Sequence, residues 1–229
     1  MKKNEGILLV NKPAGKTSFS LVGALRRLTK IKTIGHAGTL DPFATGLVVL
    51  LIGRPYTRLS GTFLNQEKHY TATIYLGKET DTYDCTGEIL YENPLVPSQD
   101  DVVAALKKFQ GDILQTPPMY SAKKVDGKRL YTLARQGKTI ERQACPVFIK
   151  TQLLSYNYPH IKLLIECSKG TYIRSLAYDL GKEMGCGAYL SELIRTKSGN
   201  FSLDNAVDGT LLFSHDLDIA AGVLGKICS

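Results

Sequence analysis

The strongest constraint on this chain is the stretch over residues 35–52, in which a glycine-rich segment runs directly into an apolar one. Three glycines bracket a single carboxylate, Asp41, and Pro42 follows it at once. Proline disfavours the helical conformation in the residue before it, so Asp41 is expected in a turn or extended conformation. Residues 47–52 are all apolar and predict a buried strand. Two interpretations stay open: Asp41 is a local cap in a glycine-rich turn, or it is a nucleophile held at the edge of the core.

The composition indicates a globular chain with a basic surface. With 229 residues, 43% of them hydrophobic, the chain can bury a sizeable core as one large domain or one domain with an insertion. The longest apolar run covers residues 47–52 and ends at Gly53, so it is too short to span a membrane. Residues 1–10 contain no signal-peptide core. A net charge of +8 favours a polyanionic partner, and nucleic acid is favoured over a membrane surface.

Several common site types are excluded by spacing. The five cysteines form no CxxC pair, which argues against a disulfide framework or a zinc site and predicts a reducing cytoplasm. The acidic loop over residues 79–84 lacks the glycine and the spaced glutamate of a calcium loop, so no metal is expected. Gly15-Lys16-Thr17 resembles the end of a P-loop, but Val10 stands where that motif requires its first glycine.

Hydrophobic periodicity and capping residues predict the elements. Strands are expected at residues 6–10, 47–52, 69–76, 147–153 and 161–168, and helices after Thr17 or Ser18, over 54–64, over 98–109 and from about 171. Residues 185–196 are expected to form a bend, a helical turn and a strand, and the last thirty or so residues a helical tail.

Two side chains stand out against these elements. Tyr70 lies on the more apolar face of the strand at 69–76, where it is either a plain core tyrosine or a buried ring that presents its hydroxyl. Arg174 lies in the first turn of a helix, where a cation meets the positive end of the helix dipole. That position is favourable if Arg174 faces an anion, and otherwise it is a solvated arginine with a small penalty.

The segment over residues 115–138, which we call the basic insertion, differs in character from the rest of the chain. Its cations outnumber Asp126, its one acid, and Met119, Tyr120 and Tyr131 are interleaved with them. Cations mixed with aromatic residues suit the neutralisation of an RNA backbone and the stacking of bases. A solvated insertion without a ligand is the alternative. The cations are Lys123, Lys124, Lys128, Arg129, Arg135 and Lys138.

Taken in order, several segments resemble the TruB-type tRNA pseudouridine synthases. The resemblance extends over about residues 6–200 and includes the stretches 6–13, 35–46, 68–70, 76–84, 118–122, 167–174 and 185–188. It implies the pseudouridine synthase catalytic fold, an α+β fold with a mixed, mostly antiparallel central sheet flanked by helices and loops. It also implies the conversion of uridine 55 in the T-loop of tRNA to pseudouridine, with no metal and no cofactor.

The resemblance also implies the site. Asp41 is then the nucleophile, Arg174 the cation that pairs with it, and Tyr70 the tyrosine that stacks on the target base. The expected substrate-binding residues are Lys12, His36, Asp84, Tyr172 and Leu193, with His36 filling the space that the flipped uridine leaves. The basic insertion matches the RNA-gripping loop of the family, with Lys123, Lys124, Lys128 and Arg129 as RNA-binding residues.

The chain departs from many relatives beyond residue 200. We expect one catalytic domain over residues 1–200 and a short tail over 201–229, which is too short for the separate PUA domain that many relatives carry. The expected partner is the T-stem-loop of tRNA, bound by a cytoplasmic monomer. Two alternatives stay open: a tRNA-folding chaperone without turnover and a guide-RNA-dependent synthase. A KH-like module with Gly35–Gly38 as its GxxG loop is disfavoured, because that loop leads into Asp41, Pro42 and a strand instead of a basic helix.

Overall fold

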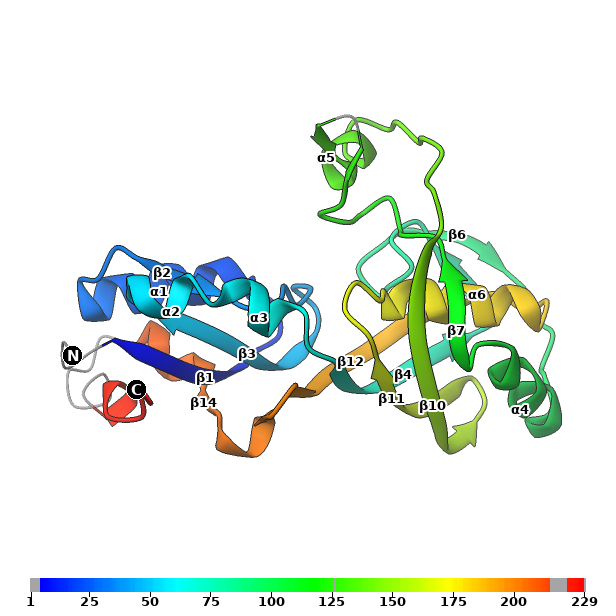
Figure 1. Ribbon diagram of the computed structural model, residues 1–229. Coiled ribbons are helices and arrows are strands. Elements are labelled where there is room, and N and C mark those ends of the chain that lie inside the picture. The colour runs from blue at the N-terminus through cyan, green and yellow to red at the C-terminus, as the bar shows by residue number, and fades with distance from the viewer. Residues whose placement is uncertain (1–4, 126, 215–221, 229) are drawn as a thin grey trace. The chain divides into compact units, whose positions relative to one another are not determined.

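The structure is a computed structural model that describes residues 5–125, 127–214 and 222–228. The chain divides into two compact units, and Figure 1 shows the elements of each (Figure 1). Unit 1 comprises Met1–Thr71 and Leu193–Ser229, and unit 2 comprises Ala72–Glu192. Strands β4 (Lys68–Leu76) and β12 (Ala188–Ser198) contribute residues to both units.

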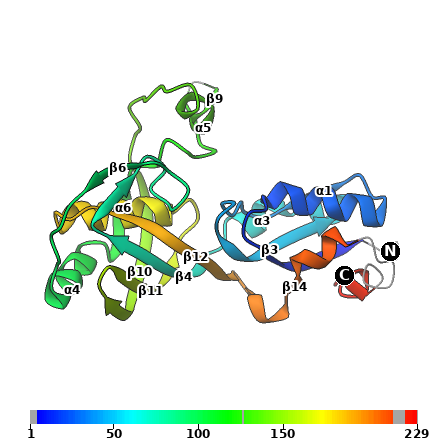
Figure 2. The same cartoon turned by 180° about the vertical axis from the view of Figure 1, so that it is seen from behind.

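Unit 1 is built on a short mixed sheet. Strand β1 pairs antiparallel with β3 and parallel with β14, and β3 pairs parallel with β12. Every residue of β3 after Thr45 is buried, as the apolar run predicts, so both faces of this strand are covered. Figure 2 shows α1 running along one side of the sheet (Figure 2). The elements are β1 (Gly6–Lys12), α1 (Ser18–Thr29), β2 (Ile34–His36), β3 (Thr45–Ile52), α2 (Arg54–Thr57), α3 (Ser60–Leu64), β13 (Phe201–Ser202), η1 (Leu203–Asn205), β14 (Val207–Asp208) and η2 (Gly209–Phe213).

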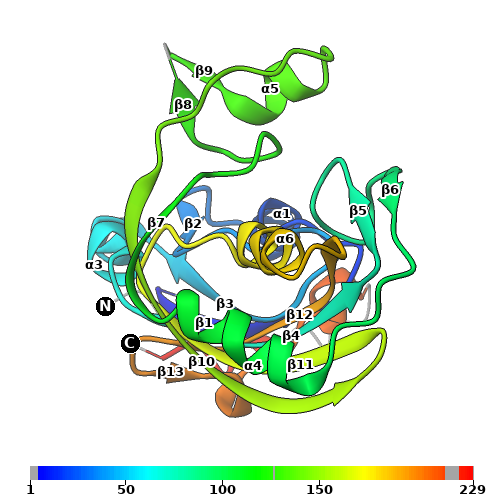
Figure 3. The same ribbon diagram turned by 90° about the vertical axis from the view of Figure 1, so that its right-hand side faces the viewer.

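Unit 2 is built on strands that follow the order β12, β4, β11, β10 and β7, with β10 antiparallel to both β7 and β11. Helix α6 buries its apolar stripe in this unit, and Figure 3 looks almost along its axis (Figure 3). The elements are β5 (Lys78–Thr80), β6 (Ile89–Glu92), α4 (Gln99–Lys108), β7 (Gly111–Gln115), β8 (Lys124–Val125), β9 (Lys128–Arg129), α5 (Leu130–Ala134), β10 (Cys145–Asn157), β11 (His160–Cys167) and α6 (Ile173–Glu183).

The predicted α+β class with a mixed, mostly antiparallel sheet is confirmed, and so are most local expectations. Thr17 caps α1, Ser98 and Asp101 form a reciprocal capping box on α4, and β4 alternates buried and half-buried residues from end to end.

Three local predictions are wrong. Residues 54–64 form two short helices instead of one, with the break at Arg58–Leu59. The helical turn expected within 185–196 is part of strand β12, because β12 lies between β3 and β4 in the sheet and pairs with both. The helical tail is replaced over 201–213 by short strands and 3-10 turns, and its part over 215–221 lies outside the described residues. Only residues 222–224 of the described tail are α-helical.

Candidate active site

Asp41 lies in unit 1, in the loop between β2 and β3, which we call the Asp41 loop (residues 37–44). Its side chain is half-buried, and its carbonyl accepts a hydrogen bond from the Ala44 amide at 3.2 Å. The loop leads into β3 through Gly46, which has φ 104° and stands so close to the backbone of Arg195 that a Cβ would collide with it. Only glycine meets both conditions, so the glycine seen in the sequence fixes how closely β3 and β12 approach here.

Lys12 holds the Asp41 loop from one side. Its side chain is fully buried at the end of β1, and Nζ donates to the carbonyls of Pro13, Lys16 and Pro42 at 2.9, 2.7 and 3.1 Å. Burial lowers the pKa of Lys12 to about 8, while the negative charge of Asp41 acts in the opposite direction. Its prediction as a substrate-binding residue is not tested by these contacts, which give it a positioning role in the loop.

Arg195 holds the same loop from another side, and the sequence analysis did not single it out. Its guanidinium is 1% exposed and donates to three carbonyls: Nε to Leu47 at 2.7 Å, Nη2 to Gly38 at 3.0 Å and Nη1 to Thr39 at 3.2 Å. The only indication of this role in the sequence is a cation within a predicted strand whose pattern is typical of a half-buried one. Such a cation is rarely buried unless it has partners, and here the partners are backbone groups that no side-chain pattern reveals.

Tyr70 and Leu193 belong to unit 1, and each lies close in the chain to a residue that contacts the Asp41 loop or the start of β3. Tyr70 is 8% exposed and lies two residues after the buried Lys68 on the same face of β4. Lys68 Cε is 3.7 Å from the position that a Cβ on Gly38 would occupy, so Lys68, at the start of β4, lies against the Asp41 loop. Leu193, 6% exposed, directly precedes Ile194, which pairs with Thr45 at the start of β3.

His36, at the end of β2, belongs to this group as well. Burial lowers its pKa and the charge of Arg195 lowers it further, whereas a backbone hydrogen bond with Gly38 opposes both. Its Nδ1 is buried and has no hydrogen-bond partner among the described residues. A neutral, half-buried imidazole is compatible with stacking on a base, which is the role that the resemblance implies.

Unit 2 contains a second polar cluster, centred on Arg174 and Asp84. The guanidinium of Arg174 is 5% exposed in the first turn of α6, with Nε 3.6 Å from Asp84 Oδ2. Nη1 donates to the Thr82 carbonyl at 3.1 Å and Nη2 to the Tyr120 carbonyl at 2.9 Å. The anion expected near this cation is therefore present, because Asp84 is one of its partners.

Asp84 and the neighbouring residues form a tightly held turn. Asp84 Oδ1 accepts from the hydroxyl of Thr82 at 2.8 Å and from the amide and hydroxyl of Thr86 at 2.9 and 2.5 Å. Tyr83 has φ 63°, an uncommon conformation for a residue with a side chain, and its ring stacks on Tyr178 of α6 at 4.0 Å between centroids. Backbone strain of this kind collects at functional sites, so this turn is a candidate for one.

Tyr172 is the residue before α6, and its backbone is fixed by a single side chain. Gln115 donates to the Tyr172 carbonyl at 3.0 Å and accepts from the Tyr172 amide at 2.8 Å. This pair joins the end of β7, where the basic insertion begins, to the start of the helix that carries Arg174.

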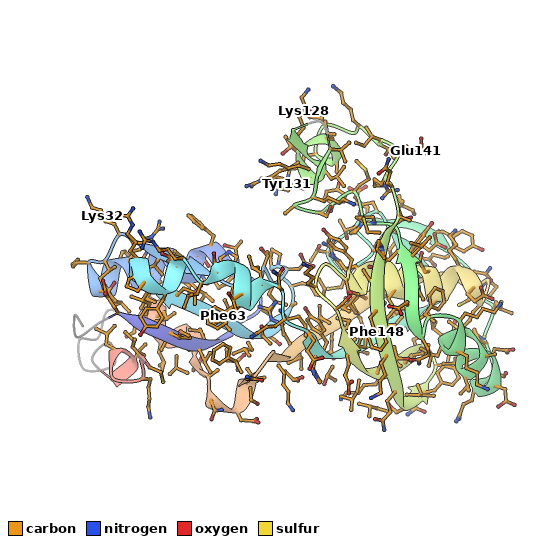
Figure 4. The ribbon with its side chains drawn as sticks, in the orientation of Figure 1. Lys32, Phe63, Lys128, Tyr131, Glu141 and Phe148 are labelled. Carbon is orange, nitrogen blue, oxygen red and sulfur yellow. The ribbon has the colours of Figure 1, made fainter. Side chains whose placement is uncertain are left out.

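The basic insertion projects from unit 2 between β7 and β10, and Figure 4 shows Lys128 at its outer end (Figure 4). Lys124, Lys128 and Arg129 are exposed, whereas Lys123 is half-buried with Nζ 2.7 Å from Cys145 Sγ. The Tyr131 ring has the guanidinium groups of Arg129 and Arg135 at 5.8 and 5.4 Å from its centroid. Asp126 lies outside the described residues.

The predicted site residues therefore fall into two groups. Unit 1 contains Lys12, His36, Asp41, Tyr70 and Leu193. Unit 2 contains Asp84, Tyr172 and Arg174 together with the cations of the basic insertion. Over the described ranges, no group of three or more His, Cys, Asp or Glu side chains is arranged to hold a metal ion. Across the same ranges, no helix combines the length and the apolar character needed to cross a bilayer.

Comparison with known families gives matches over most of the chain. Residues 26–173 match the family described as "TruB family pseudouridylate synthase (N terminal domain)". Residues 174–217 match "tRNA pseudouridylate synthase B C-terminal domain", so this likeness extends into the segment beyond residue 200 that the sequence analysis left as a tail.

Curated relatives are similar over nearly the whole chain. A tRNA pseudouridine synthase B of Protochlamydia amoebophila is 60% identical over 90% of this chain and 78% of its own length. Proteins with the same name from Chlamydia trachomatis serovar L2 and Clostridium acetobutylicum are 54% and 47% identical, over 94% and 86% of this chain and 90% and 68% of theirs.

Two solved structures share the fold. A chain of a Cbf5-Nop10-Gar1 complex superposes with a TM-score of 0.73 at 25% identity. A chain of an H/ACA RNP bound to a substrate RNA containing 2'-deoxyuridine gives 0.71 at 23%. In both cases the likeness covers 98% of this chain, which spans somewhat less than three fifths of those longer chains (59% and 58%).

Proposed function

Because the chain belongs to the TruB family of pseudouridylate synthases, we propose that it isomerises a uridine of tRNA to pseudouridine, and that this uridine is position 55 in the T-loop. The observation that carries the proposal is the Asp41 loop. Two buried cations hold the backbone on both sides of its one carboxylate: Lys12 donates to the Pro42 carbonyl, and Arg195 donates to the carbonyls of Gly38 and Thr39. A loop fixed this firmly suits a group that must meet a substrate in one orientation.

The reaction exchanges one bond for another within the nucleotide. The bond between ribose C1′ and base N1 breaks, the base rotates, and C5 joins C1′. C5 then loses its proton and N1 gains one, so the reaction is balanced without an oxidant, a reductant or a cofactor. The protein must therefore supply a nucleophile or an anion for the first step, a surface on which the base turns, and a group that moves the proton.

We assign the first of these tasks to Asp41. An ionised carboxylate can attack C1′, attack C6 of the base, or stabilise the cationic or glycal species formed when the glycosidic bond breaks, and all three routes stay open. Lys12 and Arg195 support any of them, since both hold the backbone of the loop that carries Asp41. They also remove the need for the loop to reorganise as the reaction proceeds.

The remaining assignments are proposals of the same kind. Tyr70 stacks on the target base and its hydroxyl takes part in the final proton transfer, while Leu193 and Tyr172 line the base. His36 occupies the space left by the flipped uridine, which offsets part of the lost stacking. Arg174 and Asp84 act in the same reaction, with Arg174 as the cation that serves Asp41. Substitution of each of these residues tests its role through the rate of pseudouridine formation.

The RNA-binding proposal rests on the basic insertion, whose exposed cations Lys124, Lys128 and Arg129 suit phosphate groups. A tRNA substrate also leads us to propose a cytoplasmic location. Since one chain carries every residue assigned a role, we propose that a monomer acts.

The decisive experiment compares wild type with Asp41→Asn, which removes the charge and keeps the size. Incubated with a tRNA transcript, the wild type is expected to form pseudouridine at position 55 and nowhere else, as read from a position-resolved modification map. Asp41→Asn is expected to form none, with RNA affinity unchanged. The matched control is Asp112→Asn, which removes an exposed carboxylate from β7 and is expected to react as wild type.

The same experiment separates the alternatives. Product formed by Asp41→Asn would refute the nucleophile, and tight binding of tRNA by a wild type that forms no product would favour the chaperone. A guide-RNA-dependent synthase would stay inactive on the bare transcript. The relatives named tRNA pseudouridine synthase B, at 47–60% identity, favour activity on the transcript itself.

A further inference from the structure

Helix α1 and the start of α2 form a basic face on unit 1 that the proposed active site does not use. Five exposed cations lie on it: Arg27, Lys30, Lys32, Arg54 and Arg58. The two stretches are adjacent because the Gly53 amide donates to the Thr33 carbonyl at 2.8 Å, and Figure 4 shows Lys32 extending outward from this end of the unit (Figure 4). Among the described residues, none of the five forms an ion pair with a carboxylate.

The surrounding sequence is almost free of acids. Between residues 6 and 66 the only acidic residue is Asp41. Glu5 lies against Gly53, at the edge of this face. A surface with five unpaired cations attracts polyanions. The negative end of the α1 dipole accounts for Arg27 in the last turn, but it does not account for Lys32, Arg54 or Arg58, which lie outside that helix.

One side of α1 changes in character along its length: Phe19 and Lys30 are exposed, whereas Gly23 and Arg26 are half-buried, and Arg26 Nη2 donates to the Ile34 carbonyl at 2.9 Å. Phe19, Gly23, Arg26 and Lys30 follow one another at helical spacing, so they share one face. Phe19 is 65% exposed at the start of the helix, which is an unusual position for a large aromatic ring. The helix therefore presents a ring at one end, a bare backbone in the middle and positive charge at the other end.

Gly23 is the informative member of this face. Glycine is disfavoured in the middle of a helix, and a Cβ built on Gly23 would meet nothing within 4 Å. Packing within the chain therefore gives no reason for glycine at this position. A helix glycine with open space in front of it suits the close approach of a ligand backbone, because it lets the ligand reach the helix itself.

The direction of α1 connects this face to Asp41. The helix begins beside the Asp41 loop, where Ser18 Oγ accepts from the Leu40 amide at 2.9 Å. It then runs for 12 residues, which at 1.5 Å per residue places its basic end roughly 18 Å from that loop. A hairpin whose loop nucleotide is at Asp41 therefore has its stem within reach of Lys30 and Lys32 if the stem follows the helix.

We propose that the α1–α2 face binds the sugar–phosphate backbone of the RNA stem that carries the target uridine. Phe19 contacts the loop end of the hairpin, Gly23 admits the backbone, and the five cations neutralise phosphates of the stem. This proposal rests on the proposed function, because it takes the RNA loop to be at Asp41. It adds a second RNA-binding surface, separate in sequence from the basic insertion and specific for the double-stranded part of the substrate.

The test measures the salt dependence of binding for Arg27→Gln/Lys30→Gln. Two hairpin RNAs are used, one with its full stem and one with the stem cut to the base pairs next to the loop, in an Asp41→Asn background that prevents turnover. For the full stem, the double variant is expected to bind about ten-fold more weakly and to lower the slope of log K against log salt by about 2. For the cut stem, both quantities should equal those of the parent.

The matched control is Lys107→Gln/Lys162→Gln, which removes two exposed lysines from unit 2 and is expected to leave the slope unchanged. Gly23→Ala is the second variant. It is expected to raise the melting temperature, since alanine is the better helix former, and yet to weaken binding of the full stem several-fold. In active enzyme, the α1 variants should raise KM without changing kcat.

Three results would overturn the proposal: an unchanged slope for the full stem, an equal loss with the cut stem, or wild-type affinity in Gly23→Ala. Binding of wild type to vesicles of anionic phospholipid that the double variant loses, with RNA binding intact, would assign the face to a membrane instead. Failure of wild type to modify tRNA would refute the proposed function, whereas the slope and stem measurements would still decide on the α1–α2 face.

Discussion

The Asp41 loop and the basic insertion are both connecting segments that carry residues assigned a functional role, yet they are built in opposite ways. The loop spans residues 37–44, and the buried cations Lys12 and Arg195 hold its carbonyls from both sides. The insertion exposes all of its cations except the half-buried Lys123. At its base, Arg174 donates to the Tyr120 carbonyl. Positive charge therefore fixes the backbone in the first segment and faces solvent in the second.

This difference gives each segment a separate measurable role. Cations that satisfy buried carbonyls contribute to folding and to the precise position of the reacting group, so their loss should reduce kcat and stability together. Exposed cations contribute to RNA affinity through their charge, so their loss should raise KM and leave stability unchanged. A variant of an exposed cation that lowers stability, or a variant of a buried cation that changes only KM, would contradict this distinction.

The largest effect is expected for Arg195→Met. It removes the donor for the carbonyls of Gly38, Thr39 and Leu47, so the free energy of unfolding should fall by roughly 3 kcal/mol or more. A small shift of the Asp41 loop should also lower kcat about 100-fold. Denaturant unfolding and single-turnover rates measure the two effects. Arg195→Lys keeps the charge and loses the fork of donors, so it should lie between wild type and Arg195→Met. A stable Arg195→Met with full activity would contradict the positioning role.

Lys12 gives a pH test of the same idea. Its pKa is lowered to about 8 by burial, so Lys12 loses its charge as the pH rises through 8, and the support that it gives to the ionised Asp41 declines. The single-turnover rate of wild type should therefore fall above pH 8. Lys12→Met should be roughly 10-fold slower at pH 7, because no cation stands in its place, and should lack this alkaline fall. The same fall in both proteins would assign it to another group.

The insertion should respond in the opposite manner. Lys124→Gln/Lys128→Gln/Arg129→Gln removes three exposed charges, so KM for tRNA should rise about ten-fold and the salt slope of binding should decrease by up to about 3. The value of kcat and the midpoint of denaturation should not change. Lys123 is left in place because it contacts Cys145. A loss of stability in this triple variant would show that the insertion is part of the folded core.

The contrast also explains what could be predicted from sequence. Local patterns specified the capping of α1 by Thr17, the capping box at Ser98 and the alternation of β4, because each depends on residues close together in the chain. The glycines and proline around Asp41 likewise indicated a constrained loop. The α+β fold and the pseudouridine synthase family were predicted from a resemblance that depends on several segments in a shared order, since each segment alone is a weak match.

Features that depend on distant backbone groups could not be predicted. The residues near Arg195 in the sequence do not indicate that its partners are carbonyls about 150 residues away. The proximity of Lys68 to Gly38 could not be predicted for the same reason. The extended conformation at 189–196 comes from the position of β12 between β3 and β4 in the sheet, where pairing overrode a local preference for a turn. Backbone carbonyls carry no sequence signature, so a buried cation that serves them looks like any other cation.

The smallest effect concerns a half-buried acid in unit 2, Asp179, that contrasts with Asp84. Whereas Asp84 accepts several hydrogen bonds, burial raises the pKa of Asp179 from 3.8 to about 6. The folded state therefore holds its proton more tightly than the unfolded chain, so stability falls as the pH rises from about 4 to 6 and stays lower above that range. Asp179→Asn should remove this penalty.

The gain from Asp179→Asn should be about 1 kcal/mol at pH 7.5, less than a shift of two units implies, because solvent reaches part of the side chain. It should vanish near pH 4, where the aspartate is protonated in the folded state. Urea unfolding at both pH values measures the difference, with Asp112→Asn as the exposed control that should show no gain at either pH. A gain of equal size at pH 4 would attribute it to better packing instead of to the removal of a buried charge.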